Sequence, residues 1–234
     1  MTKTVLLATA GLFALTGASY SGTVHPTAGV SNHFAKHPVF GVTPGSTTLY
    51  DQNGNDSGSG FTSQNFETLF DQYDSQGADD FTVPDGHNWQ IKEIDVTGQY
   101  LYTGGNADTA NVFFYKNKGG LPGKQIAECD NVSTNDTGTG AFVLKMPKSC
   151  KIDLKAGHYW VTVQANLDLN STAQQWFWET NTTPLGAAAA WQDPNGGWAG
   201  LGVPSDCNTW KMLSYCLAGS SGDWMFALKG KDKG

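Results

Sequence analysis

Arginine is missing from this sequence of 234 residues: all 14 basic residues are lysines, 21 residues are acidic, and the formal net charge is −7. Without the planar guanidinium group the chain lacks the side chain that best recognises phosphates and base edges. Its net negative charge also repels polyanions. We therefore expect no nucleic-acid partner and no binding to anionic lipid.

Long apolar runs are also missing, apart from Val5–Leu15 near the start. This run follows Lys3 and precedes small residues at 17–21, an order typical of a secretory signal peptide, and it is too short to cross a bilayer core of about 30 Å. We predict a signal peptide over residues 1–22 and no membrane insertion elsewhere. The mature chain is then secreted to the extracellular space, with the periplasm as a compartment of transit.

Helical periodicity is scarce, and short runs of β-forming residues recur between turns rich in glycine, asparagine and proline. Residues 23–47 show no sustained period and predict a flexible leader. The remainder, 48–234, predicts a single all-β domain, an antiparallel β-sandwich of the jelly-roll kind, with a closed barrel as the second choice. The expected strands cover residues 48–51, 80–83, 89–100, 109–116, 125–129, 140–146, 158–166, 174–180, 187–192 and 223–229.

Alternation within residues 158–165 predicts which side chains face the core. Trp160 belongs to the outer set, and the inner set consists of Tyr159, Val161, Val163 and Ala165. If residues 158–166 and 174–180 form a hairpin, one register puts Trp176 and Trp178 outside beside Trp160, and a shift by one residue puts both into the core. We favour the core, because exposing two indoles costs more than exposing Phe177.

Four cysteines in an exported chain predict disulfides. Four cysteines allow three pairings, which the sequence does not decide between. We favour Cys129 with Cys150 and Cys207 with Cys216, because each pair encloses one local excursion of the chain. Their spacing does not match that of metal-binding cysteines.

Several short motifs resemble those of a recurrent, uncharacterised β-sandwich domain of secreted bacterial proteins. The resemblance covers nearly all of the chain after the leader and implies an extracellular β-sandwich, in some relatives fused to a surface-anchoring tail, with no activity to carry over. The motifs are LYDQ at 49–52, ADDFTVP at 78–84, NVFFY at 111–115, GLPG at 120–123, YWVTVQ at 159–164, QWFW at 175–178 and AWQDP at 190–194.

Common catalytic motifs are absent: the sequence has no GxSxG elbow, HExxH pair, Walker loop or CxxCH site. A glycosidase needs two carboxylates about 5–10 Å apart. Glu179 and Asp80 are acids on which such an activity could depend, but nothing in their spacing marks them out among 21 acidic residues. We expect a non-catalytic protein, with an extracellular hydrolase as the alternative.

A structural calcium ion is the one cofactor that the sequence suggests. Asp79, Asp80 and Asp223 stand at predicted strand starts, where carboxylates and carbonyls can surround a hard cation. The alternative is that these carboxylates cap turns.

Aromatic residues interleaved with amides are the strongest functional signal, because sugar faces stack on flat rings while amides bind their hydroxyls. Trp198 lies in a glycine-rich loop at 196–202, between Trp191 and Trp210. We predict a ligand-binding set of Trp191, Trp198, Trp210, Trp160, Gln192 and Asn195. The alternative is a small core cluster held by Cys207 and Cys216.

Together these features predict a secreted, non-catalytic binding module whose partner is a glycan or another polymer of a cell surface or matrix. A structural component of a matrix or appendage is a further alternative, and it would self-associate.

Overall fold

The structure, a computed structural model, describes residues 26–30, 40–41, 44–101, 105–169 and 174–234. The predicted signal peptide at 1–22 lies outside these residues, as does much of the predicted leader.

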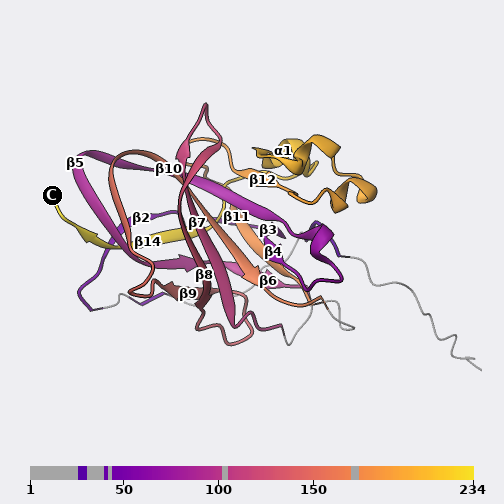
Figure 1. Cartoon of the computed structure of the whole chain (residues 1–234), viewed down its shortest axis with the longest axis horizontal. Helices are drawn as coiled ribbons and strands as arrows, with labels where there is room; N and C mark the ends of the chain where they lie inside the picture. The colour runs from indigo at the N-terminus through magenta and orange to yellow at the C-terminus, as the bar shows by residue number, and fades with distance from the viewer. Residues whose placement is uncertain (1–25, 31–39, 42–43, 102–104, 170–173) are drawn as a thin grey trace, which may run out of the picture.

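Two β-sheets packed against each other form the molecule (Figure 1). The smaller sheet has the strand order β1 (Gly29–Val30), β3 (Asp56–Thr62), β11 (Trp176–Asn181) and β6 (Gly98–Tyr100). The main path of the larger sheet runs through β13 (Lys211–Met212), β12 (Ala190–Gln192), β5 (Gln76–Val96), β10 (Ile152–Asn166), β7 (Thr109–Asn117) and β8 (Pro122–Ser133).

Four further strands attach to this larger sheet. Both β14 (Phe226–Asp232) and β9 (Phe142–Lys145) pair with β5, β2 (Thr47–Asp51) pairs with β14, and β4 (Gln64–Asn65) pairs with β10. Among the described residues every pairing except β10 with β4 is antiparallel, and neither sheet closes into a barrel. The predicted all-β sandwich is confirmed.

Within the described residues, helical structure is limited to short turns. They are the 3₁₀ turns η1 (Asp71–Tyr73), η2 (Gly197–Leu201) and η3 (Ser205–Asn208) and the one-turn helix α1 (Leu213–Cys216). In the described part of the chain, no helix has the length and apolar character that crossing a bilayer requires.

The expected strands 80–83 and 89–100 are parts of one strand, β5, and the chain does not reverse between them. Val83 lies opposite Gly157 and Asn88 opposite Lys155, so both flanks pair with β10. Residues 84–87 therefore stand against one residue of β10, and Gly86 adopts a φ of 82°. The local sequence forms a bulge in one long strand, which bends the strand without ending it.

The faces of β10 follow the predicted alternation. Tyr159, Val161, Val163 and Ala165 belong to the main core between the sheets. Trp160 points to the other side of the sheet, where it packs with Ala78, Phe113, Tyr115 and Ala190. We call these five residues the outer cluster.

The hairpin considered between residues 158–166 and 174–180 does not form. Strand β10 lies in the larger sheet and β11 in the smaller one, where β11 pairs with β3 and β6. Trp176 and Trp178 face the main core, as we favoured, and Phe177 is buried on the opposite side of β11. Both faces of β11 are thus covered, a tertiary outcome that alternation cannot predict.

Both favoured cysteine pairings are confirmed: Cys129 bonds to Cys150, and Cys207 to Cys216. The Cys129–Cys150 bond links β8 to the segment before β10. The Cys207–Cys216 bond closes a short loop, because its two cysteines are nine positions apart in the sequence.

Candidate functional site

Residues 190–217 form a small lobe at one end of the larger sheet, which we call the stapled lobe (Figure 1). Its strand β12 pairs with β5, where Trp191 lies opposite Gly77, and with β13, where Trp191 lies opposite Lys211. The Cys207–Cys216 disulfide ties η3 to α1. The lobe is thus fixed both to the sheet and to itself.

The glycine-rich loop of the lobe is an ordered turn. Gly196 and Gly202 flank η2 with φ values of 76° and 96°, a region that favours glycine. The buried Asp193 carboxylate accepts hydrogen bonds from the N–H groups of Gly196 (3.0 Å) and Trp198 (2.9 Å). Burial raises the pKa of Asp193, and these N–H groups offset part of that rise.

Trp191 and Trp198 lie inside the lobe and not on its surface, which corrects the prediction that their rings stack on a ligand. Both are fully buried, and their rings meet edge to face at 6.3 Å. The Trp191 indole N–H donates to the carbonyl of Thr62 (2.8 Å), and that of Trp198 donates to the carbonyl of Tyr73 (2.8 Å). Burial with a satisfied N–H is the usual state of a structural indole, so these rings anchor the lobe to the sandwich.

Trp160 is also fully buried, so its predicted ligand contact is corrected in the same way. Its indole N–H donates to Asn117 Oδ1 (3.0 Å), and its ring stacks against that of His158. Trp210 differs, because it is only half-buried and packs its ring edge to face against Tyr115 at 5.6 Å. Trp210 thus covers the outer cluster while part of it stays in solvent.

The two predicted amides remain partly accessible, but each already has a protein partner. Gln192 Nε2 donates to Gln76 Oε1 (2.7 Å), and Asn195 Nδ2 donates to the carbonyl of Asp71 (2.6 Å). Of the six predicted ligand-binding residues, Trp210, Gln192 and Asn195 keep surface that a ligand could reach.

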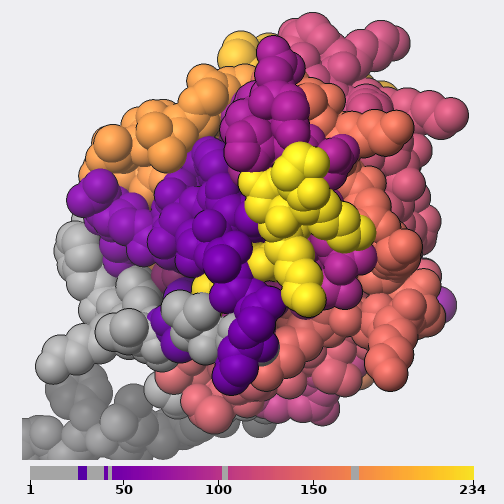
Figure 2. Space-filling view, turned by 90° about the vertical axis from the view of Figure 1, so that its left-hand side faces the viewer, coloured from indigo at the N-terminus to yellow at the C-terminus, as the bar shows by residue number. Residues whose placement is uncertain are grey.

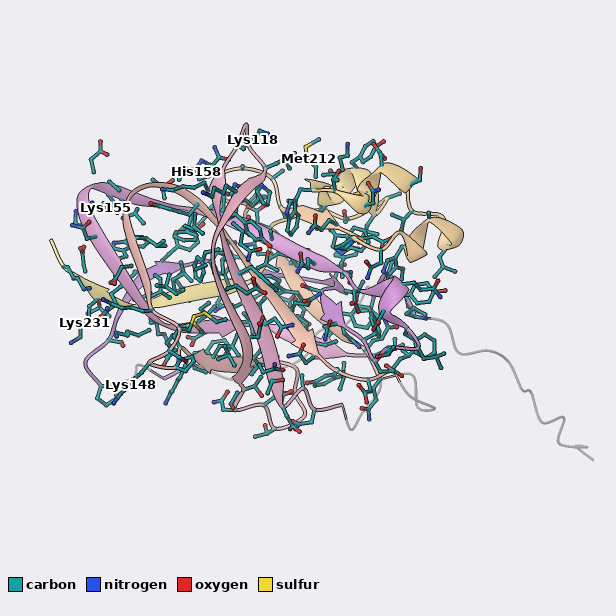
Figure 3. All side chains as sticks on the ribbon, in the orientation of Figure 1. Lys118, Lys148, Lys155, His158, Met212 and Lys231 are labelled. Carbon is teal, nitrogen blue, oxygen red and sulfur yellow. A yellow bond between two sulfur atoms is a disulfide. The ribbon has the colours of Figure 1, made fainter. Side chains whose placement is uncertain are left out.

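Two surface residues of the lobe were missed by the sequence reasoning. Tyr215 and Met212 are each 50% exposed, and Met212 projects from the outside of the molecule in Figure 3. The Tyr215 hydroxyl contacts both carboxylate oxygens of Asp206 at 3.1 Å, and Lys211 Nζ lies 3.2 Å from Asp206 Oδ2. Lys211, followed by Tyr215, lowers the pKa of the Asp206 carboxyl. This surface combines the exposed Tyr215 ring and Met212 thioether with the Asp206–Lys211 ion pair.

A groove of about 380 Å³ lies on another side of the lobe, between it and the smaller sheet. Leu201, Val203 and Leu217 of the lobe face Val30 of β1 and Phe61 of β3 across it. Among the described residues that line it, Ser59 brings the one side-chain hydroxyl, and none has an amide or charged side chain. The volume falls in the range of small-ligand pockets, about 300–1,000 Å³, and the polar groups of the lining come mainly from the backbone.

The three aspartates predicted for calcium are occupied by hydrogen-bond donors. Asp79 accepts from Gln52 Nε2 (2.8 Å) and from the N–H of Trp224 (2.7 Å). Asp223 accepts from the N–H groups of Leu185 (2.7 Å) and Ala189 (3.1 Å). Burial raises the pKa of both carboxyls, most strongly that of Asp79. Among the residues described, no group of three or more His, Cys, Asp or Glu side chains could hold a metal ion. The hydrogen bonds of Asp79 and Asp223 instead join segments that are far apart in the sequence.

Asp80 forms a pair with His158. Its Oδ2 contacts His158 Nε2, and its Oδ1 accepts from the N–H of Ala187 (2.8 Å). Asp80 is buried, so its pKa is raised by burial even though the N–H of Ala187 and His158 lower it. The pair fixes the segment before β12 over the outer cluster, and the imidazole stays one-third exposed.

Glu179 and Asp80, the acids considered for hydrolysis, belong to β11 of the smaller sheet and β5 of the larger sheet. Both are buried.

Tyr215 and Met212 had one sequence signal, namely their position inside the short loop that the Cys207–Cys216 pairing closes. A loop held by a disulfide has little room for a core of its own, so some of its apolar residues must face water.

No family model, curated protein or solved structure matches this chain.

Proposed function

We propose that this chain is a non-catalytic binding module for a glycan or another polymer of a cell surface or matrix. Its contact surface would be the outside of the stapled lobe, formed by Trp210, Met212 and Tyr215 with Asp206 and Lys211. The half-exposed ring of Tyr215, held by its hydroxyl on Asp206, is the observation that carries the proposal.

The distribution of exposed apolar side chains supports this choice of surface. Among the described residues the large exposed apolar ones are Leu69, Ile126, Leu185, Leu201, Met212 and Tyr215. Met212 and Tyr215 belong to the proposed surface, and Leu201 lines the groove on another side of the lobe. Grouped apolar exposure on a folded domain marks interaction surfaces. The lobe also has a rigid base, because Trp191 and Trp198 anchor it from inside.

A glycan fits the outer surface better than the groove does. Sugars need a flat apolar face together with polar partners for their hydroxyl groups. The Tyr215 ring, the Asp206 carboxylate and the Lys211 ammonium supply both, whereas the groove offers one hydroxyl and otherwise apolar side chains or backbone.

We also infer that the module works outside the cytoplasm. Two disulfides occur in this chain, and disulfides persist in oxidising compartments such as the periplasm and the extracellular space. The signal-peptide pattern at residues 1–22 supports the same compartment.

Affinity measurement on immobilised glucan, chitin and xylan tests the proposal. We expect retention on at least one polymer and a loss of about tenfold or more in affinity for the double variant Trp210→Ala/Tyr215→Ala, since two stacking contacts contribute about 1.4 kcal/mol or more. Leu69→Ala is the matched control, because Leu69 is 79% exposed and lies outside the lobe.

If Trp210→Ala/Tyr215→Ala binds a polymer as tightly as the wild type does, the binding site lies elsewhere on the molecule. The absence of retention on every polymer, combined with sedimentation as a growing oligomer, would favour a structural matrix component instead.

A further inference from the structure

A lysine is buried between two acidic side chains on the larger sheet. Lys229 of β14 lies directly opposite Glu93 of β5, and Asp95 is two residues further along β5 on the same face. All three side chains are at most 4% exposed. Lys229 Nζ contacts Asp95 Oδ2 and lies 3.3 Å from Glu93 Oε1.

This face of the sheet is on the side away from the main core. Ile94, Val96 and Leu228, the alternate residues of the same two strands, belong to the core. The triad is covered in part by the segment that contains Gly41, whose carbonyl accepts a hydrogen bond from Lys229 Nζ (2.7 Å). Figure 2 shows the C-terminal residues in yellow among the indigo N-terminal ones.

Burying the charges of this triad is costly. Two carboxylates and an ammonium group are removed from water, and each ion must be desolvated before their attraction offsets the loss. Asp95 Oδ1 is buried and has no hydrogen-bond partner among the described residues. A reaction that removes charge from this site would relieve both costs.

We propose that Lys229 and Asp95 become joined by an intramolecular amide bond, with Glu93 as the residue that transfers protons. The geometry supplies a nucleophile in contact with a carboxyl group, and a second carboxylate beside the nucleophile. Holding the reacting groups together in this way replaces activation by a separate reagent.

The step balances without an oxidant or any co-reactant. Glu93 takes a proton from the Lys229 ammonium, and the neutral Nζ attacks Cγ of Asp95 in its protonated form. Glu93 then gives this proton to the departing hydroxyl group of Asp95 and takes a second proton from the nitrogen, so that the amide is neutral and Glu93 ends protonated. One C–N bond forms, one C–O bond breaks, and one water molecule leaves.

The protonation state that this step needs is within reach. Burial raises the pKa of Asp95 to about 6, with smaller increases from Glu93 and Asp51 that the Lys229 contacts oppose. Burial lowers the pKa of Lys229, but its contacts with Asp95 and Glu93 raise it overall, so the ammonium group needs a base in contact with it, which is the role of Glu93.

Intact-mass measurement of the purified mature chain, unfolded and with both disulfides reduced, tests the proposal. We expect a mass lower than that of the sequence by one water molecule. Proteolysis should then give a branched peptide that joins the segment around Asp95 to the segment around Lys229.

Three variants give the controls. Lys229→Arg and Glu93→Gln should restore the full mass, and Lys145→Arg should keep the deficit, because Lys145 lies opposite Glu93 on β9 but is exposed. Cyclisation at Asp85–Gly86 would also remove one water, but the deficit would then persist in Lys229→Arg. A wild-type chain of full mass, or a deficit that survives in Lys229→Arg, overturns the proposal.

Discussion

A buried indole whose N–H binds a backbone carbonyl stabilises the structure around it, whatever its neighbours in sequence. Trp198 combines complete burial, an N–H bond to Tyr73, and edge-to-face contacts with Trp191 and Tyr73. Tyr215, by contrast, leaves half of its surface in water. Within one lobe, Trp198 therefore stabilises the fold, whereas Tyr215 is available for contact with a partner.

Substitutions at the two positions should therefore differ in their effect on stability. We expect Trp198→Ala to lower the free energy of unfolding by about 3–5 kcal/mol, because it leaves a cavity under the lobe. Tyr215→Ala should lower it by less than about 1 kcal/mol, as surface changes do. Urea denaturation of the two variants measures both values, and similar small losses would show that Trp198 is not an anchor.

Asp74 gives the molecule a pH-dependent stability. Its Oδ1 accepts from the N–H of Phe66 (2.8 Å), and burial, followed by weaker repulsion from Asp71 and Asp193, raises its pKa to about 6. A raised carboxyl pKa means that its stabilisation is present below the unfolded pKa, near 4, and is lost as the pH rises through about 6.

Replacing Asp74 with Asn removes that titration and keeps the acceptor oxygen. The stability of Asp74→Asn relative to wild type should therefore increase by about 1–2 kcal/mol between pH 4 and pH 7, after allowance for the partial exposure of the site. Denaturant midpoints at several pH values measure the difference. A difference that is constant with pH would contradict the raised pKa.

At the scale of elements, the disulfide between η3 and α1 should matter for the lobe more than for the sandwich. Strand β12 pairs with the larger sheet and the two buried indoles bond to the sandwich, whereas η3 and α1 are joined to each other by Cys207–Cys216. The other disulfide, Cys129–Cys150, lies in a different part of the molecule, near β8 and β10.

Removing each disulfide therefore gives different results. The double variant Cys207→Ala/Cys216→Ala should lose about 2–3 kcal/mol of stability, the value for a loop of this length, together with polymer binding. Cys129→Ala/Cys150→Ala should lose stability but keep binding. Calorimetry and the polymer retention assay report the two effects, and binding that survives the first variant would contradict the role of the lobe.

At the scale of the whole molecule, the sheets are joined by aromatic residues near the C-terminus. Trp178 of the smaller sheet stacks on Trp224 at 5.2 Å and meets Phe226 of β14 edge to face at 6.2 Å. Its indole N–H donates to the carbonyl of Met225 (2.9 Å). One core thus holds strands of both sheets.

The shared core predicts cooperative unfolding. Trp178→Leu should lower the free energy of unfolding by about 3 kcal/mol while leaving one transition, since both sheets lose the same contacts. Far-ultraviolet circular dichroism and tryptophan fluorescence should give coincident melting curves. Two separate transitions would show that the sheets are stable independently.

The sequence by itself determined the features that depend on local chemistry. The alternation in β10 predicted which of its side chains enter the core, because successive side chains of a strand point to opposite faces. Glycine and proline positions predicted breaks between strands, although the break expected after residue 83 is a bulge within β5. Many short strands together predicted the all-β sandwich, whereas the sequence favoured the observed disulfide pairs without deciding between the three pairings.

Only the tertiary structure decided which residues reach solvent and which strands are neighbours. Trp191 and Trp198 lie in a segment whose composition is typical of an exposed loop, yet carbonyls of Thr62 and Tyr73, more than a hundred residues away in sequence, bind them inside. The same holds for Lys229 and Asp95, which β14 and β5 bring into contact. Burial and long-range pairing depend on the whole chain packing at once, so no local pattern records them.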